Sequence, residues 1–77
     1  MSEVFVFDHP LSLGQKVRIA RIARRWTQDD LAEEACVAQH QVSALERDLP
    51  VYPAARRRIL ECLGLLTELQ PEEAIDA

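Results

Sequence analysis

The stretch spanning residues 28–47 constrains the fold most, because its apolar residues recur at helical spacing in two short runs. The first run predicts a helix over Gln28–Ala35 and the second predicts a helix over Gln39–Arg47. Since only residues 36–38 separate them, the two helices must cross at an angle and bury their apolar sides together. Ala32 is small enough to let the second helix pass close by. We expect the angle between the helices to be filled by Leu31, Ala35, Val37, Val42 and Leu45.

Two capping boxes mark where helices begin. Ser12 and Gln15 match the S-x-x-Q form of this motif, so a helix should start with Ser12 as its cap and run to about Arg25. Thr27 and Asp30 can form a shortened version at the start of the second helix. The first helix is expected to bury Leu13, Val17 and Ala20, with Ile19, Ile22, Ala23 and Trp26 widening its apolar arc.

A fourth helix is expected after a linker that contains two prolines. Pro53 suits the first position of this helix, which should run to about Leu63, and Gly64 marks its end. Its buried stripe is expected to contain Ile59, Cys62, Leu63 and Leu66.

Length and composition bound the class of protein. A chain of 77 residues that is 48% hydrophobic, with 2 Gly and 4 Pro, predicts one small all-α domain, a compact bundle of four to five helices. We expect an N-terminal arm or strand over residues 1–11, the helical domain over 12–66 and an acidic tail or short helix over 67–77. No run approaches the roughly 18 apolar residues of a membrane span and no signal-peptide pattern opens the chain, so a cytoplasmic protein without a membrane partner is expected.

The N-terminal arm contains a short run of β-branched and aromatic residues with no second strand evident later in the chain. It can pair with its own copy across a two-fold axis, lie extended over the core, or remain a disordered or merely packed arm; we favour the first. The tail also contains more leucines than a small monomer should expose. The candidate dimer contacts are Val4, Phe5, Phe7, Ile19, Ile22, Leu65, Leu66 and Leu69.

The net charge of −4 is unevenly distributed. All nine Lys and Arg residues lie between positions 16 and 58, against six acidic residues in that segment, so the segment carries +3 and both ends are acidic. A basic face is therefore compatible with the acidic whole, and weak non-specific affinity for DNA with strong salt dependence is expected. The alternative is that the arginines form only a solvated helix face.

Three features together resemble one protein family: the TQxxLA pattern from Thr27 to Ala32 with Trp26 before it, the following turn, and the Leu45-Glu46-Arg47 triplet. Over roughly residues 13–65 the chain resembles the Cro/cI-like (XRE) regulators of bacteria and phages. The resemblance implies a lambda-repressor-like fold with a helix-turn-helix, and a homodimeric regulator of transcription, with repression favoured, that reads a near-palindromic operator in double-stranded DNA.

The resemblance also implies which residues contact DNA, with the helix over 39–47 in the major groove. The base-reading candidates are Gln39, His40, Ser43, Ala44 and Arg47, and the phosphate-contact candidates are Gln28, Gln41, Tyr52, Arg56 and Arg57. For Arg21 the family implies a structural pair with an acid such as Glu46. Alternatives remain: the polar face is only soluble surface, Tyr52 caps the core, and the arginines after position 55 pair with Glu61 or Asp48.

Position 36 departs from the family, which usually has glycine there to allow a positive φ angle. Cys36 therefore suggests strain or an altered turn. Cys36 and Cys62 are expected to be reduced thiols packed as small hydrophobic residues. Cys36 and His40 stand four residues apart, but the turn breaks the helical register between them, so no metal site is expected.

A second class of function uses the same fold for protein binding, as an antitoxin or adaptor that contacts a protein partner through Phe5, Phe7, Ile19 or Ile22. An enzyme is not expected, because the sequence has no nucleophile–base set, metal cluster or phosphate-binding loop. No cofactor is expected.

Overall fold

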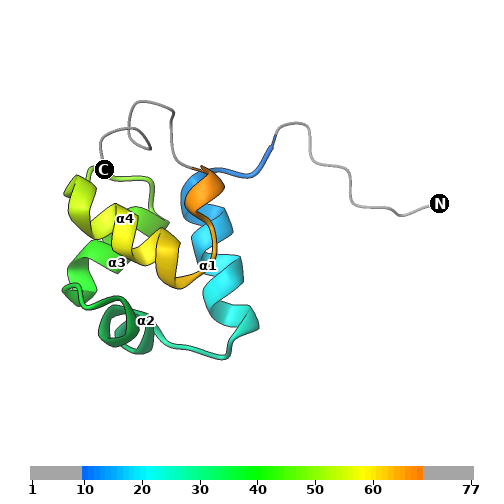
Figure 1. Ribbon diagram of the computed structural model, residues 1–77. Coiled ribbons are helices and arrows are strands. Elements are labelled where there is room, and N and C mark those ends of the chain that lie inside the picture. Colours follow the sequence, from blue (N-terminus) through cyan, green and yellow to red (C-terminus); the bar gives the residue numbers. More distant parts are fainter. Residues whose placement is uncertain (1–9, 69–77) are drawn as a thin grey trace.

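Helices account for all the regular secondary structure in the computed structural model, which describes residues 10–68 (Figure 1). The elements are α1 (Leu13–Ala23), α2 (Gln28–Ala35), α3 (Gln39–Glu46), α4 (Pro53–Cys62) and the 3₁₀ helix η1 (Leu66–Glu68). The expected all-α class is confirmed for the described residues. Four of the candidate dimer contacts lie outside them, namely Val4, Phe5, Phe7 and Leu69.

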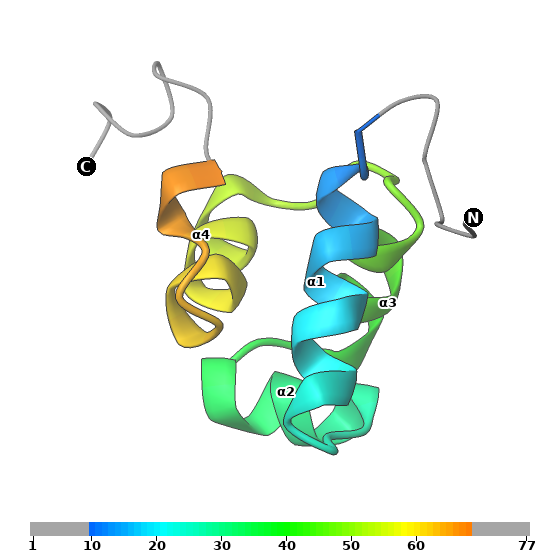
Figure 2. The ribbon, with the colours of Figure 1, turned by 90° about the vertical axis from the view of Figure 1, so that its right-hand side faces the viewer.

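The helices pack around α3, which contacts α1, α2 and α4 (Figures 1 and 2). Helix α4 packs against both α2 and α3, and α1 packs against α3. The pair α2 and α3 is therefore contacted by α1 and by α4. The connection between α2 and α3 is the three-residue segment 36–38, as the sequence predicts. This short connection limits the angle between α2 and α3, and so determines which side of α3 faces outward.

Both expected capping boxes are present. At α1, the Ser12 hydroxyl accepts a hydrogen bond from the Gln15 amide at 3.1 Å, and the Gln15 side chain accepts one from the Ser12 amide at 2.7 Å. At α2, Thr27 and Asp30 exchange the equivalent bonds at 3.0 and 2.8 Å. Pro53 occupies the first turn of α4, as expected. The capping boxes satisfy amide groups that have no partner inside a helix, so the starts of α1 and α2 are fixed locally.

Each of the four helices is followed, one or two residues after its last residue, by a residue with a left-handed backbone. The amide that follows this residue bonds back to a carbonyl five positions earlier, as Val37 does to Ala32 at 3.0 Å. Helix α1 ends two residues before the expected Arg25, because Arg25 itself turns left-handed. The left-handed residues and their φ angles are Arg25 (61°), Cys36 (59°), Asp48 (58°) and Gly64 (74°).

Cys36 adopts a positive φ angle of 59°, a conformation in which a residue with a Cβ atom is expected to be strained. A Cβ atom in this conformation destabilises the folded state by about 1–2 kcal/mol. Replacing the residue with glycine removes that cost, but the more flexible unfolded chain offsets about 0.4–1 kcal/mol of the gain. We therefore expect Cys36→Gly to raise the free energy of unfolding by about 0.5–1 kcal/mol, measured by urea unfolding with reductant present. Cys36→Ala is the matched control, since it keeps the Cβ atom and should gain nothing. Equal stability of the two variants would contradict a strained turn.

The core contains most of the expected apolar residues and two that were not expected, Ala55 and Leu60. Cys62, Leu65 and Leu66 are half-buried and pack against this core, so the two leucines are not the exposed dimer contacts that the sequence suggested. Ile19 and Ile22 on α1 are instead 54% and 53% exposed. The buried cluster consists of Val17, Leu31, Ala32, Ala35, Val42, Leu45, Ile59, Leu60 and Leu63.

The first turn of α1 lies directly against the end of α3. A Cβ atom on Gly14 would stand 2.5 Å from the Leu45 carbonyl oxygen and 2.7 Å from that of Glu46. The Asp48 carboxylate joins the same contact, accepting hydrogen bonds from the Gly14 amide at 3.0 Å and the Ser12 hydroxyl at 2.8 Å. Asp48 thus places a negative charge at the positive end of α1, which is favourable. This contact sets how α1 braces α3.

Candidate functional site

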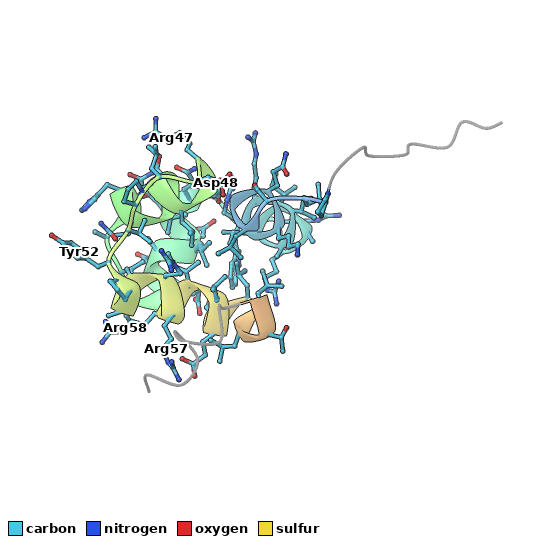
Figure 3. The ribbon with its side chains drawn as sticks, turned by 90° about the horizontal axis from the view of Figure 1, so that it is seen from above. Arg47, Asp48, Tyr52, Arg57 and Arg58 are labelled. Carbon is cyan, nitrogen blue, oxygen red and sulfur yellow. The ribbon has the colours of Figure 1, made fainter. Side chains whose placement is uncertain are left out.

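The outer face of α3 carries the expected base-reading candidates. Gln39, His40 and Arg47 are exposed, whereas Ser43 and Ala44 are half-buried. Figure 3 shows Arg47 at the end of α3, directed away from the helices. The structure therefore places four of the candidates on α3 and the fifth, Arg47, at its C-cap, with Gln39 and His40 exposed in the first turn.

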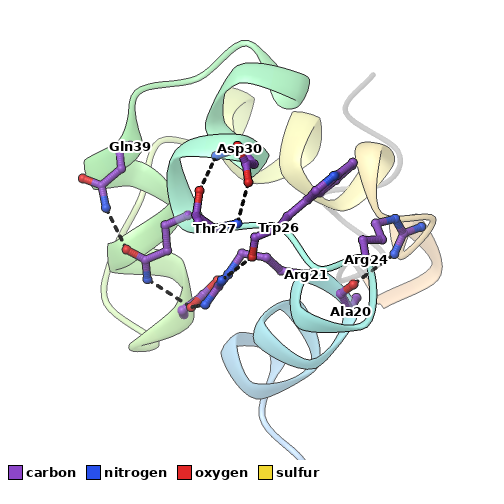
Figure 4. A network of polar contacts seen from close by, with 9 residues as sticks. Ala20, Arg21, Arg24, Trp26, Thr27, Asp30 and Gln39 are labelled. Carbon is purple, nitrogen blue, oxygen red and sulfur yellow. Dashed lines mark hydrogen bonds and ion pairs between the residues drawn. The ribbon is translucent and has the colours of Figure 1, made fainter.

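An ion pair connects α1 to the last residue of α3 (Figure 4). Arg21 Nε lies 2.6 Å from one oxygen of Glu46, and Arg21 Nη2 donates to the other at 3.1 Å. The third donor, Arg21 Nη1, bonds the Trp26 carbonyl at 2.7 Å. The two charged side chains are 11% and 4% exposed. The expected structural pairing of Arg21 with Glu46 is confirmed.

Two glutamines extend this ion pair to the surface. Gln28 Nε2 donates to Glu46 Oε1 at 3.1 Å, and Gln28 Oε1 accepts from Gln39 Nε2 at 2.7 Å. Gln28, which is half-buried at the start of α2, therefore links a base-reading candidate on α3 to the ion pair (Figure 4). Each glutamine keeps a second N–H hydrogen for another acceptor.

The remaining phosphate candidates lie around the junction of α3 and α4. Gln41 Oε1 accepts from the Tyr52 amide at 3.1 Å, which leaves the NH₂ group of Gln41 free to donate elsewhere. Tyr52 is 74% exposed, so the alternative that it caps the core is wrong. Arg56 and Arg57 are half-buried in the first turns of α4. Figure 3 shows Tyr52 projecting outward, with Arg57 on the other side of α4 from Arg47 in that view.

A shallow hollow lies beside the turn, and both cysteines line it together with Glu34, Arg58 and Glu61. Burial raises the pKa of the Cys62 thiol above its usual value, and the nearby Glu34 charge adds to this rise while Arg24 opposes it. Both cysteines are free. Cys36 is exposed, not packed as the sequence suggested.

Other features of the described residues bear on the class of site. No helix within residues 10–68 is long and apolar enough to cross a membrane. In the same part of the chain, no three His, Cys, Asp or Glu side chains are grouped to hold a metal ion. Comparison with protein-family models, curated proteins and solved structures found no match.

Sequence reasoning missed the contacts between the helices at this site. The bond from Gln39 to Gln28 joins residues 11 apart, and nothing in either residue's local pattern predicts it. The close approach at Gly14 had only a weak signal, since a glycine inside a helical pattern lowers helix stability by about 1 kcal/mol relative to alanine. The role of Asp48 at the start of α1 depends on a side chain 34 positions away from Gly14, which periodicity cannot reveal.

Proposed function

We propose that α2, the turn over 36–38 and α3 form a helix-turn-helix of the Cro/cI type, and that the protein binds operator DNA with α3 in the major groove. In this proposal the protein is a binding module, not an enzyme, and represses transcription by covering a promoter. The observation that carries it is Gln39, an exposed amide in the first turn of α3 that Gln28 holds in place at 2.7 Å. First-turn side chains of such a helix are those that reach base edges.

Groups suited to binding phosphate lie on α3 and on residues that hydrogen-bond to it. The N-cap residue of α3, Ala38, has no polar side chain, so the first-turn amides of α3 are not capped by it. Exposed amides at a helix N-terminus attract anions. Gln28 and Gln41 each have an unused N–H, and Tyr52 offers its hydroxyl. These neutral donors can position a phosphate backbone without a strongly basic surface, which fits a chain of net charge −4.

A homodimer completes the proposal. Ile19 and Ile22 are each more than half exposed and one helical turn apart on α1, an apolar surface that a second copy could cover. Two copies would present two α3 helices about 34 Å apart, one turn of DNA, and would read a near-palindromic site.

The proposal is tested by selecting bound duplexes from a random pool at low and moderate salt. We expect the wild type to enrich one inverted repeat, with a salt slope that corresponds to about six or more phosphates neutralised by arginines per dimer. The double variant Gln39→Ala/His40→Ala should lose that repeat, because it removes the two most exposed base-reading candidates. Thr67→Ala, an exposed change on η1, is the control and should select the same repeat as the wild type.

The same exposed isoleucines favour a second candidate function, the binding of a protein partner through α1. If the wild type enriches no sequence at either salt concentration, operator binding is excluded and the protein-binding candidate remains. Changes at Ile19 and Ile22 should then abolish partner binding, while changes at Gln39 and His40 should have no effect.

A further inference from the structure

The outer side of α1 combines apolar and positively charged side chains. Ile19 and Ile22 lie one helical turn apart on it and are 54% and 53% exposed. Arg18 and Arg25 are exposed beside Ile22, and neither side chain has a hydrogen bond or ion pair with another residue of 10–68. Residues 13–26 contain no acidic side chain. A segment that covers this side of α1 must therefore offer both apolar and acidic groups.

The arm at the start of the chain has this composition. Residues 3–8 read Glu-Val-Phe-Val-Phe-Asp, and residues 1–12 contain no Lys or Arg. In an extended segment alternate residues share a side, so Glu3, Phe5 and Phe7 would form one row with about 6.6 Å between neighbours. Residues three apart on a helix are separated by about 5–6 Å. The spacing of the arm therefore suits a row of every third residue on α1.

Such a row exists on α1, with the charge at the correct end. Ile19, Ile22 and Arg25 follow one another at intervals of three residues. When the arm runs antiparallel to α1, its two phenylalanines meet the two isoleucines, and Glu3 comes beside Arg25. Apolar groups then cover apolar groups, and an acid faces an arginine that has no other partner among the described residues.

The start of α1 indicates that the arm on this surface comes from a second copy. Ser12 has an extended backbone (φ −72°, ψ 164°), and its hydroxyl donates to Asp48 at 2.8 Å. A residue before proline also favours an extended backbone, so His9 is expected to continue outward. To reach its own α1, the arm would have to reverse within residues 10 and 11. Figure 1 shows residues 10–12 leading away from the helices.

We propose that the arm of each subunit lies extended over α1 of the other subunit, with Phe5 and Phe7 covering Ile19 and Ile22. The exchange is reciprocal, as a two-fold axis requires, so each copy gives one arm and receives one. The inference rests on the homodimer of the proposed function and names the segment that forms it. It does not rest on DNA binding.

The acidic tail is the other segment of the chain with the right charge, and it fits this surface less well. Its large apolar residues, Leu69 and Ile75, are six positions apart, which corresponds to about 20 Å in an extended segment. Ile19 and Ile22 are separated by only about 5–6 Å. One copy of the tail could therefore cover one isoleucine but not both.

Sedimentation equilibrium without DNA measures the dissociation constant of the dimer. Phe5→Ser/Phe7→Ser should raise it at least about 100-fold, because both aromatic contacts are lost at two interfaces. Val4→Ser/Val6→Ser is the matched control, since it makes the same arm less apolar on its opposite side and should raise the constant less than about fivefold. Circular dichroism checks that the helices persist in every variant.

Charge reversal tests the contact between Glu3 and Arg25. Glu3→Arg and Arg25→Glu should each raise the dissociation constant about 5- to 30-fold, because like charges then meet at both interfaces. The combined variant Glu3→Arg/Arg25→Glu restores opposite charges and should return the constant to within about threefold of the wild type. A combined variant weaker than both single variants would contradict this contact.

Mixing two variants distinguishes an exchanged arm from other arrangements. Phe5→Ser/Phe7→Ser keeps an intact α1, and Ile19→Ser/Ile22→Ser keeps an intact arm. A heterodimer of the two contains one complete arm–helix contact, whereas each homodimer contains none. Native mass spectrometry should therefore show heterodimers at concentrations about tenfold below those at which either variant pairs with itself.

The outcomes separate this inference from the proposed function. A wild type that stays monomeric at about 1 mM overturns the inference and the proposed homodimer together. A dimer that tolerates the phenylalanine changes, or a mixture without excess heterodimer, overturns the inference and leaves a homodimer formed by direct contact between α1 helices or by pairing of the arms. A wild type that exchanges arms as described but enriches no DNA sequence supports the inference and overturns operator binding.

Discussion

Gly14→Ala is expected to destabilise the fold by about 2–3 kcal/mol, although alanine is normally the better helix former. The new Cβ atom would stand 2.5 and 2.7 Å from two backbone carbonyl oxygens at the end of α3. Backbone atoms cannot rotate away as a flexible side chain can, so α1 must shift from α3 and lengthen the bond from the Gly14 amide to Asp48. For a domain of this size the midpoint of thermal unfolding should fall by about 10–20 °C.

The other described glycine provides the control. Gly64 has no atom within 4 Å of an added Cβ, but its φ angle is +74°. Gly64→Ala should therefore cost only the conformational penalty, about 1 kcal/mol. If Gly14→Ala were no more destabilising than Gly64→Ala, the close contact between α1 and α3 would be wrong.

The helices could be predicted from the sequence because their signals are local. The two capping boxes, the proline that opens α4 and the glycine that follows it lie within one or two turns of the ends they mark. The end of α1 was predicted too late because its left-handed residue is Arg25. Arginine gives no sign of a positive φ angle, whereas a glycine such as Gly64 does. Leu60 was missed because the stripe drawn along α4 was narrower than the side that α2 and α3 cover.

The site could be predicted only in part. Periodicity places Val42 and Leu45 inward, and so gives the outward face of α3 that carries Gln39 and His40. The family resemblance supplied the Arg21–Glu46 pair, which joins residues 25 apart. Neither source supplied the bond between Gln28 and Gln39, because it depends on the angle at which α2 and α3 cross.

Arg21→Met is expected to cost about 3–5 kcal/mol of stability, the largest effect of any single change considered. The methionine keeps the apolar stem but removes the charge, and the Glu46 carboxylate is left with Gln28 as its remaining partner while its side chain is 4% exposed. An unpaired buried charge is far more costly than an exposed one. Urea unfolding at neutral pH measures the loss. Arg18→Met is the control, since Arg18 is exposed on the same helix and should change stability by less than about 0.5 kcal/mol.

The double variant Arg21→Met/Glu46→Leu distinguishes a charge left alone from a lost attraction. If most of the cost comes from the stranded carboxylate, removing both charges should restore stability to within about 1–2 kcal/mol of the wild type. The residual loss has two sources. The Trp26 carbonyl would still lack the bond that it accepts from Arg21 at 2.7 Å, and Gln28 Nε2 would lack the bond that it donates to Glu46 at 3.1 Å. A double variant as unstable as Arg21→Met would instead mean that the ion pair itself holds α1 to α3. Recovery would mean that the ion pair contributes little net stability. Its consequence for the molecule would then be to anchor the hydrogen bonds that run from Glu46 through Gln28 to Gln39.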